Sequence, residues 1–107
     1  MITDGRGKIT VDIANKGSRF LGRVFTQKEL RLYPYLSFCF LNNGKIEFTR
    51  TDKEEQAILQ VLENAGHIKI TERNANGTAK IYPTKQFYDF LNNILADGYV
   101  LFENEVN

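Results

Sequence analysis

The sequence predicts one small α+β domain, and three observations lead to this class. Residues 8–13, KITVDI, alternate apolar and polar side chains with the period of a β-strand. Residues 53–65 and 85–97 carry apolar side chains at helical spacing, each behind an N-terminal capping residue. Between them, residues 67–83 have the pattern of two short strands joined by a loop that contains Asn and Gly. A chain of 107 residues suits a single domain of this kind, spanning 1–107.

The first part of the chain, residues 1–31, is expected to form basic N-terminal strands. Residues 8–13 supply the first strand, and residues 15–18 supply a turn. Residues 19–25, RFLGRVF, supply the second strand, although Gly22 weakens it.

A short helix is expected over residues 27–32. Thr26 opens the sequence TQKE, which has the spacing of a capping box with Glu29. Pro34 follows and should stop the helix, because the residue before a proline avoids helical backbone angles.

Residues 35–50, YLSFCFLNNGKIEFTR, are compatible with two structures. In a hairpin with a three-residue loop at 42–44, Phe40 pairs with Ile46, and the apolar side chains share one face. In the alternative, residues 35–42 form a short buried helix that Gly44 ends. We favour the hairpin.

The second half of the chain is expected to contain helix, hairpin and helix. Thr51 opens a second capping box, TDKE, ahead of the 53–65 helix, which Gly66 ends. Its apolar face is expected to comprise Ala57, Ile58, Val61, Leu62 and Ala65.

The hairpin register pairs Ile70 with Ile81 and Glu72 with Ala79, which leaves residues 74–77 as the loop. Thr84 then caps the last helix and Gly98 ends it, while residues 99–102 form a final strand or a tail that packs on the core.

The charge is distributed unevenly along the chain. Residues 1–50 hold nine Lys and Arg against four Asp and Glu (9 − 4 = +5), and residues 51–107 hold five against nine (5 − 9 = −4). A basic surface of this kind attracts polyanions, so composition favours nucleic acid as a partner.

Residues 62–84, LENAGHIKITERNANGTAKIYPT, resemble a segment of winged-helix DNA-binding domains. Leu62 to Ile68 is similar to the turn that closes the recognition helix, Asn74 to Gly77 to the tip of the wing, and Ile81 to Thr84 to the entry into a further helix. The similarity covers residues 52–96 and implies a winged-helix-like part over 35–103. It departs from the family in lacking two clear helices before the recognition helix.

The resemblance implies a recognition helix over 53–65, with Lys53, Gln56, Gln60 and Asn64 facing outward. Acidic residues on the same helix would repel phosphates, so the wing and the N-terminal strands are expected to make most of the DNA contacts. The expected DNA-binding residues are Lys16, Arg19, Arg23, Lys69, Arg73, Asn74, Asn76 and Lys80.

No pattern for catalysis, metal binding or a cofactor is found, so we expect no enzyme and no small-molecule substrate. Cys39 lies between two phenylalanines and should be a buried thiol, and His67 follows a helix C-terminus, where the helix dipole favours its charged form. No apolar run is long enough to span a membrane or to resemble a signal peptide, which predicts a cytoplasmic protein.

These observations together predict a non-catalytic protein that binds double-stranded DNA. Its small format fits a regulator or accessory factor, for example of a plasmid, phage or other mobile element, and a homodimer is the default assembly. The alternative is a protein-interaction module or small inhibitor that binds a partner through its acidic half or through the aromatic cluster at 33–40. A weaker alternative is single-strand or RNA binding through Phe20 and Phe25.

Overall fold

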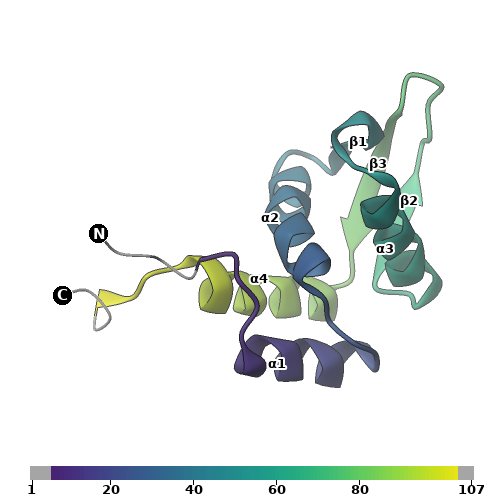
Figure 1. Cartoon of the computed structure of the whole chain (residues 1–107). Helices are drawn as coiled ribbons and strands as arrows, with labels where there is room; N and C mark the ends of the chain where they lie inside the picture. Colours follow the sequence, from purple (N-terminus) through teal and green to yellow (C-terminus); the bar gives the residue numbers. More distant parts are fainter. Residues whose placement is uncertain (1–5, 104–107) are drawn as a thin grey trace.

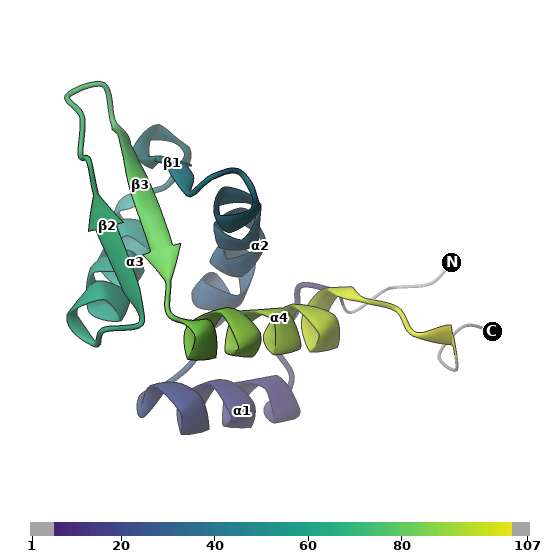
Figure 2. The ribbon, with the colours of Figure 1, turned by 180° about the vertical axis from the view of Figure 1, so that it is seen from behind.

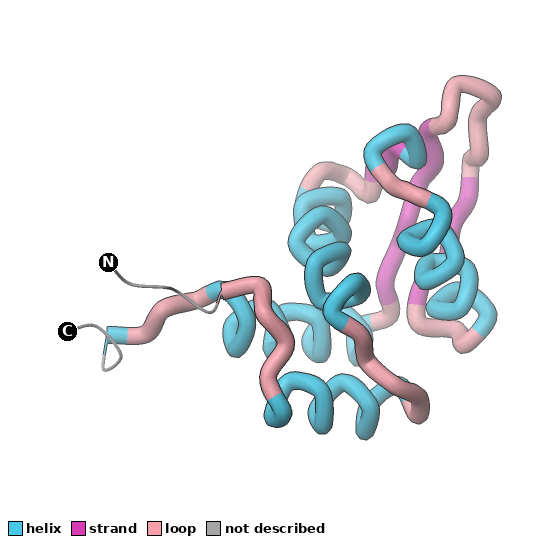
Figure 3. The backbone as a smooth tube through the Cα atoms, in the orientation of Figure 1, coloured by secondary structure: helices cyan, strands magenta, loops and turns pink. Residues whose placement is uncertain are grey.

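The computed structural model describes residues 6–103, which form four α-helices, one 3-10 helix and a three-stranded antiparallel sheet (Figure 1; Figure 3). The elements in chain order are α1 (Val11–Leu21), α2 (Gln27–Leu41), β1 (Lys45–Glu47), η1 (Phe48–Arg50), α3 (Lys53–Asn64), β2 (Ile68–Thr71), β3 (Thr78–Pro83) and α4 (Lys85–Tyr99). The α+β class predicted from the sequence is confirmed.

The sheet and the helices α1 and α4 occupy opposite ends of the molecule, and α2 lies between them (Figure 1; Figure 2). The strand order is β1-β3-β2, and both neighbouring pairs are antiparallel. One face of the sheet buries Ile46, Ile70, Ala79 and Ile81 in a single core shared with the helices. The other face carries polar side chains, as expected of an antiparallel sheet covered on one side.

The strands predicted for residues 8–13 and 19–25 are wrong, because α1 occupies residues 11–21. Residues 1–5 of the predicted N-terminal part lie outside the described range. The Thr10 hydroxyl accepts a hydrogen bond from the main-chain N–H of Ile13 at 3.2 Å and so caps the helix. The alternation of Ile9, Val11 and Ile13 suggested that all three side chains face the core. In the structure Ile13 is buried, but Val11 is 77% exposed, so the three do not share a buried face. Gly22, with φ of 71°, ends the helix in the left-handed conformation.

Gly17 explains why α1 can lie so close to the rest of the protein. A Cβ at this position would come 2.3 Å from Cγ of Phe25, a distance that no real side chain tolerates. Phe25 is 2% exposed and belongs to the core. Gly17, predicted from the sequence to lie in a turn, therefore lies inside α1 and allows the helix to pack closely against Phe25.

The helix predicted for residues 27–32 continues through Pro34 to Leu41, so the expected stop at Pro34 is wrong. Thr26 caps the helix as predicted, accepting from the N–H of Glu29 at 3.2 Å. Proline cannot donate to the carbonyl four residues earlier, which is that of Leu30. The Tyr99 hydroxyl donates to this carbonyl at 3.1 Å instead, so the oxygen left unpaired by Pro34 is satisfied by α4.

The favoured hairpin over residues 35–50 is also wrong, and the helical alternative for 35–42 is confirmed. The helix ends in a turn in which Asn43 and Gly44 have φ of 57° and 77°, and the N–H of Gly44 donates to the carbonyl of Cys39. The strand that follows, β1, pairs with β3 rather than with residues 35–42.

The helix predicted over 53–65 is confirmed, with two corrections. Its capping box is formed by Asp52 and Glu55 instead of Thr51 and Glu54. Its buried side chains are Leu59 and Leu62, while Val61 is 44% exposed.

The hairpin is confirmed with the predicted pairing of Ile70 and Ile81. The ladder ends at Thr71, because Glu72 adopts a left-handed φ of 52°, so the expected pairing of Glu72 with Ala79 is wrong.

The last helix is capped by Thr84 as predicted, but Gly98 does not end it. Gly98 lies inside α4 and is buried, and a Cβ there would come 3.3 Å from Leu30. The three residues after α4 form neither a strand nor a tail packed on the core: Val100, Leu101 and Phe102 are each 41–49% exposed.

Candidate nucleic-acid interface

A cleft of about 270 Å³ separates α3 from the β2–β3 hairpin. Its floor is apolar, formed by Phe48, Leu59 and Ile70, and its rim is polar. The rim side chains come from both elements: Gln56 and Gln60 from α3, and Arg73 from the hairpin. The fold therefore presents a polar helix face and a hairpin side by side.

The face of α3 that points to solvent is rich in side chains that can bond to nucleic acid. Lys53, Gln56, Gln60 and Asn64, the four outward positions expected from the sequence, are all exposed. Gln60 donates to the Asn64 side chain at 2.9 Å, and Gln56 bonds to Thr51 at 3.1 Å. Amides of this type can bond to base edges or to the backbone, and Lys53 can contact phosphate.

The acidic residues at α3 are mostly engaged within the fold. Asp52 accepts from the Lys28 ammonium, which lowers the pKa of Asp52, and its carboxylate also caps the helix. Glu55 accepts from the main-chain N–H of Asp52. Glu63 accepts from the N–H of Ile70 at 3.1 Å. Three of the acidic side chains that would repel phosphate, Asp52, Glu55 and Glu63, therefore make hydrogen bonds or ion pairs within the fold.

Arg73 lies at the junction of the hairpin and α3. Its guanidinium pairs with Glu63 at 3.1 Å and lies over the ring of Phe48, 5.8 Å from the centroid. An exposed pair of this kind contributes about 0–1 kcal/mol, so a phosphate can replace the carboxylate at small cost. Arg73 therefore lies at the rim of the cleft, with a guanidinium that an external anion can reach.

The loop asparagines predicted as contacts also shape the loop. Asn74 donates from its side chain to the Thr78 hydroxyl at 3.0 Å. The Asn76 side-chain oxygen accepts from the N–H and the hydroxyl of Thr78 at 3.1 and 2.7 Å. Within residues 6–103 the side-chain N–H groups of Asn76 donate no hydrogen bond, so they can still reach a ligand at the hairpin tip.

The outer face of the sheet gathers a basic cluster that includes Lys45, which the sequence analysis missed. Lys45 is paired directly with Lys80 across β1 and β3, and Lys69 is paired with Tyr82 across β2 and β3. Lys80 donates to the carbonyl of Asn43 at 3.2 Å. Lys45 joins the cluster only because β1 pairs with β3. The hairpin predicted from the sequence paired this segment with residues 35–42 instead, and so could not bring Lys45 next to Lys80.

Helix α1, which carries Lys16 and Arg19, lies far from the tip of the hairpin. In both Figure 1 and Figure 2, α1 and the hairpin tip are at opposite ends of the molecule. Lys16 and Arg19 are exposed on α1, and Lys16 pairs with Asp97 at 2.5 Å. The structure therefore divides the predicted contact residues between two surfaces.

Arg23 has a structural contact with a buried carboxylate. Its two terminal nitrogens bond to the two oxygens of Glu29 at 2.6 and 2.9 Å. Glu29 is 0% exposed and also accepts from the Tyr33 hydroxyl at 2.8 Å. Burial and the adjacent carboxylate raise the pKa of Tyr33. Because Arg23 neutralises Glu29, we leave it out of the candidate interface.

His67 and Cys39 occupy apolar surroundings. The His67 ring packs against Phe20 and Phe87 with centroids 5.1 and 5.8 Å apart, and burial lowers its pKa, so the expected preference for the charged form is wrong. Cys39 is buried as predicted, and burial raises the pKa of its thiol. Phe25, considered for base stacking, lies in the core.

The chain matches no protein-family model, and comparisons with curated proteins and with solved structures found no match. None of the helices within residues 6–103 combines the length and the apolar content needed to cross a lipid bilayer.

Proposed function

We propose that this protein is a non-catalytic, winged-helix-like domain that binds double-stranded DNA through α3 and the β2–β3 hairpin. The observation that carries the proposal is the juxtaposition of the exposed polar face of α3 with a hairpin whose rim cation, Arg73, lies across the shared cleft. An α-helix fits the major groove, and a neighbouring hairpin can then contact the adjacent backbone.

The order of elements supports the resemblance seen in the sequence. A winged helix has two helices before its recognition helix, and in this chain α2 and the three-residue 3-10 helix η1 precede α3. The two-stranded hairpin follows α3, and β1 joins it to complete a small sheet. The departure noted from the sequence is therefore confined to the second of these helices, in whose place the chain has only η1.

The proposed contacts differ from those expected from the sequence. Lys53 and Arg73, with the amides of α3 and Asn76, form the centre of the proposed interface, while Lys45, Lys69 and Lys80 extend it over the outer face of the sheet. The basic residues of α1 are not part of it. In this proposal, the protein acts on DNA as a homodimer, in the role of a small regulator or accessory factor.

Fluorescence anisotropy with random duplex DNA tests the proposal, over a series of salt concentrations. The informative variant is the triple Lys53→Ala/Lys69→Ala/Arg73→Ala. A matched control, Lys8→Ala/Arg19→Ala/Arg31→Ala, removes the same charge from exposed positions outside the proposed interface. Circular dichroism confirms that both variants keep the wild-type helix content.

The interface variant should bind more weakly and lower the slope of log affinity against log salt by roughly 2 to 3, because about 0.9 counterions are released per phosphate contact. The control should change both quantities much less. Equal losses in the two variants would show that only net charge matters. The absence of binding at low salt would refute the DNA proposal.

The second candidate function is a protein-interaction module, which one observation favours. Of the aromatic cluster at 33–40, Phe38 is 55% exposed, and Leu41 beside it on α2 is 74% exposed. Side chains of this kind suit an apolar interface. Binding through them would respond little to salt and would be lost in a Phe38→Ser/Leu41→Ser variant, which leaves the proposed DNA interface unchanged.

A further inference from the structure

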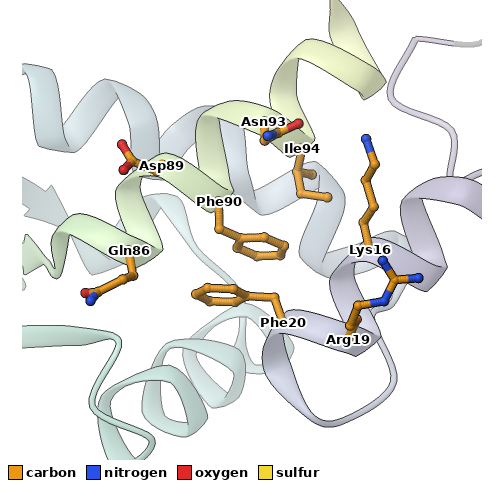
Figure 4. A pocket seen from close by; sticks show the side chains of 8 residues that line it. All are labelled: Lys16, Arg19, Phe20, Gln86, Asp89, Phe90, Asn93 and Ile94. Atoms are coloured by element: carbon orange, nitrogen blue, oxygen red, sulfur yellow. The ribbon is translucent and has the colours of Figure 1, made fainter.

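A second concave surface lies between α1 and α4, at the opposite end of the molecule from the hairpin tip (Figure 1; Figure 4). Its volume is about 600 Å³, within the range of small-molecule sites in proteins. The floor is apolar: Phe20 of α1 and Phe90 of α4 stack with ring centroids 4.2 Å apart, and Ile94 lies beside them.

The polar side chains around this groove are divided between its two ends. Figure 4 shows Lys16 and Arg19 at one end and Gln86 and Asp89 at the other, with the aromatic pair between them. The groove thus has a cationic end, an apolar middle and an end that carries a carboxylate.

Most of the charges at the groove are already neutralised by partners within the protein. Lys16 pairs with Asp97 at 2.5 Å, and Asp89 pairs with Lys85 at 3.1 Å. Arg19, by contrast, makes no hydrogen bond or ion pair within residues 6–103. What remains for a ligand is one unpaired guanidinium above an apolar floor.

The amides at the groove add unused hydrogen-bonding capacity. The side chains of Gln86 and Asn93 line the groove, and neither makes a hydrogen bond to another group in the described part of the chain. Each amide offers both donors and an acceptor. They can hold polar substituents of a ligand whose body lies on the aromatic floor.

We propose that this groove binds a small aromatic monocarboxylic acid. The carboxylate pairs with Arg19, whose planar guanidinium suits a two-point contact with a carboxylate. The ring of the ligand lies in the apolar middle, against the half-buried Phe20 and Phe90. The lining residues at the opposite end, Gln86 and Asp89, include no cation, so Arg19 sets the orientation of the acid.

A ligand ring meets the edge of the Phe20 ring and does not stack on its face. Phe90 covers one face of Phe20, and His67 packs against the same ring with centroids 5.1 Å apart. A base that stacked on Phe20 would have to displace one of these rings. The edges of aromatic rings carry partial positive charge, so they can meet the face of a ligand ring or the oxygens of an acid.

The test uses the full chain and four probes: indole-3-acetate, phenylacetate, neutral phenylacetamide and inorganic phosphate. Isotope-labelled protein is titrated with each probe, and amide chemical-shift changes give both the affinity and the location. The informative variant is Arg19→Gln, at an exposed position that the fold does not require. The matched control is Arg31→Gln, an exposed arginine of α2 outside the groove.

The aromatic acids should bind with shifts on α1 and α4, and Arg19→Gln should weaken them by about tenfold, the change expected when a charge-assisted contact is lost. Arg31→Gln should leave the affinity unchanged. Equal binding of phenylacetamide, binding of phosphate alone, or no shift at the groove would overturn the proposal. So would a concentration-dependent dimer that covers the groove. None of these results depends on DNA binding, so the two proposals can fail separately.

Discussion

Replacing Arg23 with methionine should lower the free energy of unfolding by about 3 kcal/mol, because it leaves a buried carboxylate without its cation. Glu29 is 0% exposed and loses its two hydrogen bonds from Arg23, of 2.6 and 2.9 Å. The hydrogen bond that the Tyr33 hydroxyl donates to Glu29 remains. Two bonds to a charged group amount to roughly 3–6 kcal/mol. The Arg23 side chain is 30% exposed, so water can replace part of this contact, and the lower end applies.

Urea unfolding at pH 7, followed by circular dichroism, measures this loss. The double variant Arg23→Met/Glu29→Gln should regain about half of it, since a neutral amide leaves no unpaired charge. Arg19→Met, an exposed arginine without a partner in the described residues, should change stability by less than about 0.5 kcal/mol. A loss below about 1 kcal/mol in Arg23→Met would refute the structural role of the pair. In that case Arg23 would return to the candidate DNA contacts.

Three further outcomes are expected. Gly17→Ala should cost about 2 kcal/mol in urea unfolding, because its Cβ would lie 2.3 Å from Phe25; unchanged stability would mean that α1 can move away freely. Burial lowers the pKa of His67 below 6.5, so the folded protein takes up its proton less readily than the unfolded chain, and stability should fall as pH drops below about 6.5. His67→Phe should reduce this loss between pH 7 and 5, and identical pH profiles would contradict the assignment. Tyr99→Phe should cost about 1 kcal/mol in thermal unfolding, through the lost bond to Leu30, and a neutral effect would show that water replaces the hydroxyl.

The elements predicted correctly are those whose signals are local. Apolar spacing located α3 and α4, the cap at Thr84 marked the start of α4, and the glycine-containing loop located the hairpin with its pairing of Ile70 and Ile81. Such signals act over a few residues, because a cap or a turn satisfies backbone groups close by in the chain.

The elements predicted wrongly are those that distant contacts determine. Ile9, Val11 and Ile13 have a strand period, yet the segment is helical from Val11 because Gly17 allows α1 to pack on Phe25. Pro34 has the pattern of a helix stop, yet α2 continues because Tyr99, far along the chain, bonds to the carbonyl that proline leaves unpaired.

The candidate interface was predicted in part. The exposed face of α3 and the position of Arg73 were implied by the resemblance to a winged helix, and both lie at one cleft. The grouping of the charges did not follow: Lys16 and Arg19 belong to α1, which lies at the opposite end of the molecule from the hairpin tip, and Arg23 is paired with Glu29. Charge along a sequence does not specify which residues share a surface, because the fold sets that arrangement.

By itself, the sequence determined the α+β class, the two C-terminal helices and the hairpin between them, since caps, turns and apolar periodicity are properties of short segments. Only the tertiary structure decided the helical state of residues 11–21 and 35–41, the pairing of β1 with β3, and the separation of the basic residues into two surfaces. These features depend on contacts between residues distant in the chain. Burial of Phe25, the bond from Tyr99 to Leu30 and the pairing of Arg23 with Glu29 outweigh local preference there.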